Sequence, residues 1–450
     1  MRRFIFLLTA MALALVVASG VALATTRIGT DGPGTLKGTV VGPGESIQKA
    51  VNAAHPGATI VVKGVHREDV VIRKDGIELR GDDAVIEAPA KAGSPCSKNF
   101  GLEAICVLAD VDPDTGELTG PRVKDVSVSG FTIRGFETAG PDGDAFLFDF
   151  YNSRNATITA NRIIGNVAGA VVFGNSIDAT FANNEVVGDP RNSTNGLDVE
   201  AGSRNTKIVN NVVRSYTVGI AVGGGKHNGA TNTTIEGNDF IGNSIGGLTI
   251  EDSPGTKILS NVIRGNEIVG TYVAGPKSQE AKLVGNNISG GGWGIFVGDT
   301  HGGSVVGNKV HDNCAGMFFE AFKGEPVGGF GVGGNTVTDN TRSCRGQKFG
   351  RNFSGIGIAL LGASGMRLTA NHLWGNVPSG PTPISGGVVV AKDPYFQDTN
   401  FGGKQKPKDN SVVANHFGRN KPDVFYDSSG TGNQFRANYC DTSVPTRLCG

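Results

Sequence analysis

The sequence predicts an all-β chain wound into a single-domain parallel solenoid, and three observations support this. An asparagine-centred frame recurs along most of the chain, short strand-like runs accompany each copy, and glycine is in large excess. Of 450 residues, 70 are glycine, about twice the roughly 7% share of an average chain. Collagen is excluded because the glycines follow no period of three and only 19 residues are proline.

The repeated frame is clearest when residues 157–166 (TITANRIIGN) are set beside residues 257–266 (KILSNVIRGN). An apolar residue stands three positions before the central asparagine, and another usually follows two positions after it. Successive copies lie 22 to 27 residues apart, except for two gaps of 36 and 44 residues. The central asparagines are Asn161, Asn184, Asn211, Asn238, Asn261, Asn286, Asn308, Asn335, Asn371, Asn415 and Asn438.

A second short run follows each frame and begins with glycine, as in residues 219–222 (GIAV) and 247–250 (GLTI). Alternation of apolar with small or polar residues is typical of a half-buried strand. A unit of this length with two or three strands is one coil of a parallel solenoid. At a sharp bend an asparagine side chain can bond backbone groups, and asparagine tolerates left-handed dihedrals. Stacked turn upon turn, we expect these residues to form an amide ladder inside the coil. Glycine is expected to supply positive φ there.

The chain from residue 44 to residue 440 resembles the secreted right-handed parallel β-helix superfamily, which includes the pectate lyases. Residues 45–54 (ESIQKAVNAA) carry part of the resemblance, because a short amphipathic helix of this kind caps the N-terminal end of the solenoid in that family. The apolar residues of this segment share one helical face, and Pro56 and Gly57 end it. The looser repeat pattern is most similar to bacterial exported β-helix proteins of unassigned activity.

The resemblance and the composition together divide the chain into four parts. Residues 1–24 read as a signal peptide, with two arginines, an apolar stretch and a small-x-small site before Thr25. Residues 25–43 form an N-terminal extension, residues 44–440 the β-helix, and residues 441–450 a disulfide-closed C-terminal cap. We therefore expect a secreted, extracellular monomer that is not anchored in a membrane.

The six cysteines are even in number and fall in close pairs along the chain, as disulfides of an exported protein do. Fifteen pairings are possible, and the local ones are the simplest. These local pairs are Cys96 with Cys106, Cys314 with Cys344, and Cys440 with Cys449.

Charge narrows the class of partner. Lys and Arg number 41, as do Asp and Glu, so the chain has no net charge. A surface that binds nucleic acid needs an excess of basic residues, and we expect none as a partner. We expect a polysaccharide instead, because aligning the second strands gathers acids and aromatic residues on one face.

The aligned face holds the candidate site residues. The outward position within successive strands is occupied by Asp198, Ala221, Thr249, Tyr272, Phe296 and Phe318. Just beyond the strands come Glu200, Glu251, Asp252, Asp299 and Glu320, followed by Lys226, His227, His301 and Lys323. Carboxylates bond sugar hydroxyls and exposed rings stack on sugar faces, so we interpret this face as a polysaccharide groove. The two long gaps predict loops that wall it.

Two mechanisms suit such a face. In a lyase acting on uronate polymers, Asp198, Glu251 and Asp252 would bind Ca²⁺, and Lys226 or His227 would abstract the proton beside the uronate carboxyl. Lys323 is a further candidate base. In a hydrolase, one carboxylic acid protonates the leaving oxygen while another activates water. We expect a lyase before a hydrolase or an epimerase.

Two alternatives remain open. In the first, the acids are ordinary solvated turn residues. In the second, the solenoid belongs to a non-catalytic carbohydrate-binding or cell-surface protein. Residues 193–198 (STNGLD) depart from the Asn-Thr-Asp-Gly-x-Asp motif of polygalacturonases, because Asn195 stands where the first Asp belongs. Asp149, among Phe146, Phe148 and Phe150, is interpreted as part of a buried strand rather than of the groove.

Overall fold

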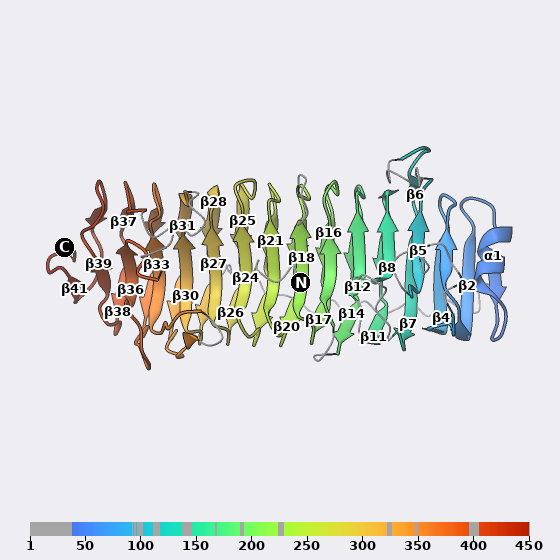
Figure 1. Ribbon diagram of the computed structural model, residues 1–450, viewed down its shortest axis with the longest axis horizontal. Helices are drawn as coiled ribbons and strands as arrows, with labels where there is room; N and C mark the ends of the chain where they lie inside the picture. Colours follow the sequence, from blue (N-terminus) through green and yellow to red (C-terminus); the bar gives the residue numbers. More distant parts are fainter. Residues whose placement is uncertain are drawn as a thin grey trace, which may run out of the picture.

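The computed structural model describes residues 38–91, 93, 96, 102–110, 118–136, 146–166, 169–189, 193–223, 229–321, 326–346, 350–395 and 405–449. These residues form an elongated solenoid with helix α1 (Ile47–Ala53) at one end and the C-terminal strands at the other (Figure 1). All pairings between strands of successive coils are parallel, as expected for a right-handed parallel β-helix. The predicted fold class is therefore confirmed.

Each central coil contributes three strands to two long sheets. A 14-stranded sheet forms one side. Its strands are β3 (Val70–Ile72), β5 (Ile105–Leu108), β8 (Phe146–Tyr151), β12 (Gly169–Gly174), β15 (Asn195–Val199), β18 (Val218–Gly223), β21 (Gly246–Glu251), β24 (Val269–Ala274), β27 (Trp293–Gly298), β30 (Ala315–Glu320), β33 (Ile356–Leu361), β36 (Gly386–Ala391), β39 (Val424–Tyr426) and β41 (Ser443–Val444).

A 25-stranded sheet forms the rest of the wall, because the two other strands of each coil are joined across a bend. Its strands are β1 (Thr39–Val41), β2 (Thr59–Arg67), β4 (Glu78–Glu87), β7 (Ser127–Arg134), β10 (Thr157–Thr159), β11 (Arg162–Asn166), β13 (Thr180–Ala182), β14 (Glu185–Gly188), β16 (Lys207–Val209), β17 (Val212–Arg214), β19 (Thr234–Glu236), β20 (Asp239–Ile241), β22 (Lys257–Leu259), β23 (Val262–Arg264), β25 (Ala281–Val284), β26 (Asn287–Ser289), β28 (His301–Val306), β29 (Lys309–His311), β31 (Gly328–Gly333), β32 (Thr336–Thr338), β34 (Arg367–Thr369), β35 (His372–Trp374), β37 (Ser411–Val413), β38 (His416–Gly418) and β40 (Gln434–Arg436). A small separate pair consists of β6 (Val123–Lys124) and β9 (Ser153–Arg154).

The frame asparagines form the predicted ladder inside the coil. Asn238 donates its backbone N–H and its Nδ2 to Oδ1 of Asn261 at 2.9 and 3.0 Å. Asn261 donates in the same way to Asn286, and its Nδ2 also bonds the carbonyl of Ile235. We call this column the main asparagine ladder. Its members are buried, so each side chain satisfies backbone groups that water does not reach.

The positive φ angles, however, do not belong to the frame asparagines. The residue just before each asparagine is left-handed, as at Asn210 with φ 55° and Ser260 with φ 53°. The asparagine side chain instead satisfies the backbone beyond the bend. The frame asparagine therefore does not use its tolerance of the left-handed conformation, whereas its predicted side-chain bonds to the backbone and the ladder are confirmed.

The glycines that begin the strands of the 14-stranded sheet are needed for space rather than for positive φ. A Cβ on Gly270 would lie 2.3 Å from the carbonyl oxygen of Gly294 and 2.6 Å from Cγ2 of Ile288. Neighbouring coils repeat this arrangement. The glycine column consists of Gly196, Gly219, Gly247, Gly270, Gly294, Gly316, Gly357 and Gly387.

Gly270→Ala is expected to lower the free energy of unfolding by about 1 to 3 kcal/mol, because the added methyl group overpacks the bend. Gly331→Ala is the matched control, since nothing lies within 4 Å of a Cβ there. Urea denaturation followed by circular dichroism measures both variants. Equal midpoints for the two would contradict the packing explanation.

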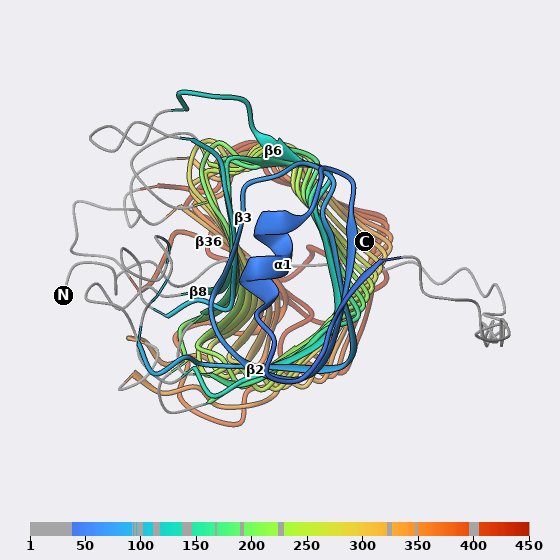
Figure 2. The same ribbon diagram turned by 90° about the vertical axis from the view of Figure 1, so that its right-hand side faces the viewer.

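Helix α1 closes the N-terminal end of the solenoid, as the resemblance implied (Figure 2). Ile47 and Val51 are buried against the first coil. The side-chain amide of Gln48 pairs with the backbone of Val71 in the edge strand β3, accepting from its N–H at 2.6 Å and donating to its carbonyl at 3.1 Å. Glu68 accepts hydrogen bonds from the N–H groups of Ile47 and Gln48 at the helix start. An open sheet edge is thereby covered.

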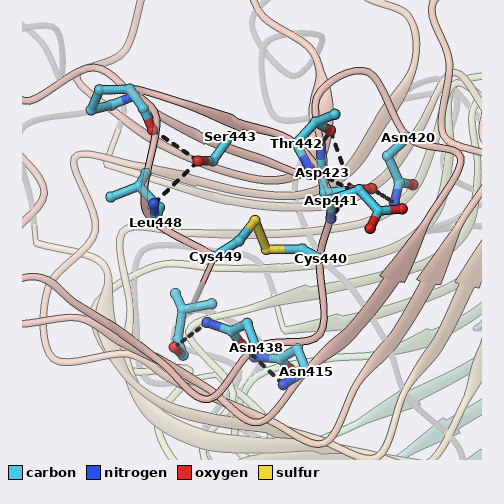
Figure 3. The surroundings of a disulfide bond; sticks show 12 residues. Asn415, Asn420, Asp423, Asn438, Cys440, Asp441, Thr442, Ser443, Leu448 and Cys449 are labelled. Atoms are coloured by element: carbon cyan, nitrogen blue, oxygen red, sulfur yellow. Dashed lines mark hydrogen bonds between the residues drawn. A yellow bond between two sulfur atoms is a disulfide. The ribbon is translucent and has the colours of Figure 1, made fainter.

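The C-terminal end is closed by the Cys440–Cys449 disulfide and by Asp423 (Figure 3). Asp423 accepts a hydrogen bond from Nδ2 of Asn420, the last member of a second asparagine column, at 2.8 Å. It also accepts from the backbone N–H groups of Asp441 and Thr442. This carboxylate therefore ties the last ladder member to the C-terminal segment.

The other two predicted disulfides, Cys96–Cys106 and Cys314–Cys344, are also formed. Three disulfides are typical of a protein of the periplasm or the extracellular space. No helix in the described part of the chain is long and apolar enough to cross a membrane.

Candidate functional site

Outward-facing side chains of the 14-stranded sheet form rows along the solenoid, and the predicted alignment of these strands is confirmed by the backbone register. The outward row, as we call it, consists of Cys106, Asp149, Val172, Asp198, Ala221, Thr249, Tyr272, Phe296 and Phe318. Neighbouring members stand on strands about 4.8 Å apart. The backbones of any two acids in this row are therefore separated by a whole-number multiple of that strand spacing.

The aromatic members of the outward row are buried, which corrects the expectation of an exposed sugar-stacking platform. Tyr272 is 1% exposed, and Phe296 and Phe318 are fully buried. Phe353, from the first long insertion, lies with its ring 6.0 Å from that of Phe318. Glu320 is also fully buried and accepts a hydrogen bond from Arg351 at 2.6 Å. The predicted loops thus cover this end of the face.

The central acids are engaged in the coil itself. Glu251 accepts a hydrogen bond from the hydroxyl of Tyr272 at 2.8 Å. Asp252 has a φ of 47° and accepts from the backbone N–H of Lys277 at 3.1 Å, as a bend residue does. Asp299 also has a positive φ and is 3% exposed. Asp252 therefore fits the alternative interpretation as a turn residue.

Of the predicted basic residues, His301 lies in the described structure, and it does not join these acids. His301 begins β28 of the other sheet, where its ring lies against Gly329. Its assignment to the groove is therefore corrected. Lys226, His227 and Lys323 lie outside the described residues, so their roles remain predictions.

The predicted Ca²⁺ ligands Asp198, Glu251 and Asp252 do not come together. Among the described residues, one group of three potential ligands has its donor atoms within 4.8 Å of one another. That group is Cys96, Glu103 and Cys106, and its two cysteines form a disulfide. The residues present do not fit the metal site that the lyase mechanism requires.

Two buried carboxyl groups lie at the N-terminal part of the outward row. Asp149 faces outward from β8, in register with Cys106 and two strands from Asp198. It is 5% exposed, and its Oδ1 has no hydrogen-bond partner among the described residues. Glu103, 1% exposed, precedes β5. We call Glu103, Asp149, Asp198 and Glu200 the acid cluster.

Burial and the charges of neighbouring acids raise the pKa values of two members of the acid cluster, so that Glu103 is protonated and Asp149 partly protonated near neutral pH. Burial, with the added charge of Glu200, raises the pKa of Asp149 to about 7. Burial, with the charges of Asp149 and Asp69, raises the pKa of Glu103 to about 9. Asp198 and Glu200 are only partly buried. Neighbouring carboxyl groups with such different environments are a feature of acid–base sites.

A tyrosine completes the cluster. The ring of Tyr151 lies over Gly174 on the next strand, where a Cβ would come 2.1 Å from the ring. Glu200 follows on the strand after that, and its charge, after burial, raises the pKa of Tyr151. Tyr151 is 38% exposed. Asn195 donates to both carboxylate oxygens of Asp198, at 2.9 and 3.2 Å. The cluster therefore combines neutral acids, oriented carboxylates and a solvent-accessible ring.

A cavity of about 400 Å³ adjoins the N-terminal end of the outward row. It lies between α1 and β3 and is lined by Gln48, Asn52, Asp69, Val71 and Arg73, among others. Val71 pairs in register with Cys106, and Asp69 is one of the charges that raise the pKa of Glu103. The cavity therefore lies next to the acid cluster, through Val71 and Asp69.

The pH dependence of stability tests the buried state of Glu103. Its pKa is raised from 4.5 in the unfolded chain to about 9 in the folded protein. The contribution of Glu103 to the free energy of unfolding is therefore lost as the pH rises between these two values. Glu103→Gln removes this loss. The melting temperature of the variant relative to wild type is expected to rise from about pH 5 to about pH 9. Exposed Glu236→Gln, the control, should show a constant difference, and a constant difference for Glu103→Gln would contradict the buried assignment.

Sequence reasoning identified Asp198 and Glu200 but did not assign Glu103 and Asp149 to the site. Extending the strand alignment two coils back places Asp149 in the row of Asp198, so the signal for Asp149 was present. Tyr151 lies one row further on the same strand. Glu103 stands outside any repeat, and its burial depends on the neighbouring strand β8, to which Ala104 donates a backbone hydrogen bond.

Comparisons with known proteins give a partial family match and no curated relative. A family model described as periplasmic copper-binding protein (NosD) matches residues 185–379, less than half of the chain. No curated protein sequence matches the chain.

Several solved structures are similar to this chain. The mannuronan C-5 epimerase A-module of Azotobacter vinelandii is 15% identical over 88% of this chain and 95% of that one, with a TM-score of 0.37. The surface adhesin PfbA of Streptococcus pneumoniae is 13% identical over 87% and 88%, with a TM-score of 0.46. The α-1,3-glucanase of Streptomyces thermodiastaticus is 12% identical over 91% and 70%, with a TM-score of 0.48. These likenesses concern the fold alone. The chain is a right-handed parallel β-helix, the fold of the superfamily that includes the pectate lyases.

Proposed function

We propose that the protein is exported and acts on a polysaccharide at the acid cluster, by acid–base cleavage of the bond between two sugars. One observation carries the proposal: a buried carboxyl, Asp149, whose pKa of about 7 leaves it partly protonated near neutral pH, in register with the partly exposed Asp198. Asp149 and Asp198 stand on strands two spacings apart, so their backbones are separated by roughly 10 Å. A pair of acids separated on this scale leaves room for a sugar bond and a water molecule.

The roles follow from the protonation states. Asp149 holds a proton and has the position of a general acid that donates to the leaving oxygen. Asp198, oriented by Asn195, or Glu200 accepts a proton from water as general base. Tyr151 presents its partly exposed ring beside these groups, where a sugar face can stack.

Elimination from a uronate is the second candidate, and the two neutral acids favour it. A protonated Glu103 or Asp149 donates a hydrogen bond to the uronate carboxylate, which acidifies the neighbouring C–H. The base would then come from Tyr151, or from Lys226, His227 or Lys323. This form of the reaction needs no Ca²⁺.

A substrate screen tests the proposal. Purified protein is incubated with neutral and uronate polysaccharides, with Ca²⁺ and with chelator, and both new reducing ends and ultraviolet absorbance of unsaturated products are measured. Reducing ends without absorbance indicate hydrolysis, and absorbance indicates elimination. Binding without either product would support the non-catalytic carbohydrate-binding alternative. If the protein neither binds nor cleaves any polysaccharide of the panel, the proposal is overturned.

A further inference from the structure

An exposed aromatic surface lies toward the C-terminal end of the 25-stranded sheet, whereas the acid cluster belongs to the other sheet (Figure 1). Among the described residues, three aromatic side chains are strongly exposed, namely Tyr151, Trp374 and Tyr439. Trp374, on β35, is 37% exposed, and Tyr439, which pairs with His416 of β38, is 68% exposed. Two of the three are therefore gathered here, and exposed apolar groups that gather on one face mark interaction sites.

The backbone register places ring-bearing side chains of this surface in a row. His372 of β35 is in register with His416 of β38, and His416 forms a parallel bridge with Tyr439 on the next coil. The three side chains therefore stand on successive coils, and all three are exposed. The outer two are separated by two strand spacings, roughly 10 Å. A row of this length can contact more than one sugar of a chain.

Contacts between the rings hold them in place. The rings of His416 and Tyr439 stack with centroids 4.6 Å apart and planes 14° apart. Those of His372 and Trp374 have centroids 5.7 Å apart and planes 7° apart. The ring of Trp374 also covers Gly418, its partner in register on β38, where an added Cβ would overlap the ring. Side chains that are already ordered lose little conformational freedom when a ligand binds.

The strand face around these rings is positively charged. The strands of the 25-stranded sheet from β25 to β40 contain no Asp or Glu. Arg419, which follows β38 and is exposed, lies with its guanidinium 5.6 Å from the ring centroid of Trp374. Neither Arg419 nor any Lys or Arg of these strands forms an ion pair within the described part of the chain. The basic residues of these strands are all exposed, and they are Lys282, Lys309, Arg367 and Arg436.

The acids of this region lie at bends rather than on the strand face. Asp312, Asp339 and Asp409 each have a positive φ, as bend residues do. Asp312 contacts Nδ1 of His311 at 2.6 Å, and Asp409 lies 3.7 Å from Nζ of Lys408. The strand face therefore keeps its positive charge, which attracts an anionic partner.

We propose that the aromatic strip formed by His372, Trp374, His416, Arg419 and Tyr439 binds an acidic polysaccharide at a second site, apart from the acid cluster. The exposed rings of Trp374 and Tyr439 stack on sugar faces, and Arg419 with the basic strand residues pairs with the carboxylates of the sugar chain. The whole chain has no net charge, which favours a sugar chain over a nucleic acid as the occupant. Binding here requires no catalysis at the acid cluster.

Binding measurements test the proposal. Titration calorimetry compares polygalacturonate and alginate, which are acidic, with methyl-esterified polygalacturonate, which is neutral. The Asp149→Asn protein is used so that cleavage does not interfere. We expect binding to at least one acidic polymer, weaker binding to the neutral ester, and further weakening as salt screens the charges. Absence of binding to both acidic polymers, or equal binding to the ester, would overturn the proposal.

Variants of the aromatic strip locate the site. Trp374→Ala combined with Tyr439→Ala is expected to raise the Kd for the acidic polymer about tenfold or more, because both stacking rings are lost. Tyr439→Ala alone is the alternative if the double variant does not fold, since Tyr439 is the most exposed of the rings, and its Kd should rise several-fold. An unchanged Kd in the folded variant would overturn the proposal.

A charge variant and its control test the role of the arginines. Arg419→Gln combined with Arg436→Gln should weaken binding of the acidic polymer and leave binding of the ester unchanged. Lys207→Gln changes an exposed residue of β16, in the N-terminal half of the same sheet, and should bind as wild type does. An equal loss in Lys207→Gln, or tighter binding of single-stranded DNA than of the acidic polymer, would overturn the proposal. Cleavage assays on the wild-type protein decide the proposed function separately, so each can fail without the other.

Discussion

Asn261→Ala is expected to lower the free energy of unfolding by about 2 to 6 kcal/mol, because it leaves buried polar groups without partners. The substitution removes the acceptor for the N–H of Asn238 and the donor for the carbonyl of Ile235. Each such orphaned group costs about 1 to 3 kcal/mol. Asn261 lies in the middle of the main asparagine ladder, so no solvent reaches the vacated space. Urea denaturation measures the loss.

Asn287→Ala is the matched control, because Asn287 is an exposed strand residue one coil away. Its effect should stay within about 0.5 kcal/mol. A solenoid can unfold coil by coil, so the midpoint and the slope of the transition are compared together. A loss for Asn261→Ala no larger than that for Asn287→Ala would show that the ladder contributes little to stability.

Asp149→Asn is expected to lower kcat/KM about 10²- to 10⁴-fold on whichever polysaccharide the wild-type protein cleaves, the range for loss of a general acid. The amide keeps the shape of the side chain but cannot transfer a proton. Because the pKa of Asp149 is raised to about 7, the wild-type rate should fall as the pH rises past that value, when the acid loses its proton.

The binding constant separates this role from a structural one. Polysaccharide affinity of Asp149→Asn should stay near that of wild type, because the proton is needed only in the reaction. Asp239→Asn, which changes an acid of the 25-stranded sheet on another side of the coil, should retain full activity. A wild-type rate in Asp149→Asn would exclude Asp149 as the acid.

The coil was predictable from the sequence because its cause is local and repeated. The spacing of Asn238, Asn261 and Asn286 predicts the coil length, the ladder and the alignment of the strands. The conformational details were less accessible. Whether Asn261 or Ser260 is left-handed depends on where the backbone turns within the frame, and the requirement for Gly270 depends on the carbonyl of the next coil.

The site was predictable only in part, because burial is not a local property. Register alone identifies Asp198 and, on extension, Asp149. The burial of Phe318 depends on Phe353 and Arg351, which arrive from an insertion that carries no repeat. For the same reason an exposed aromatic surface was predicted where the chain in fact covers its own sheet.

The carboxylate of Asp423 has a consequence for assembly. The asparagine columns are directional, since each Oδ1 accepts hydrogen bonds from the asparagine of the preceding coil, as Oδ1 of Asn420 accepts from the backbone N–H and Nδ2 of Asn376. A second molecule added at the C-terminal end would need to offer acceptors to the last donors of the column. Asp423 already occupies the donor of Asn420 and places a negative charge there, so an incoming acceptor would be repelled. The C-terminal end of this column therefore offers a carboxylate, rather than an open amide donor, to anything that approaches it.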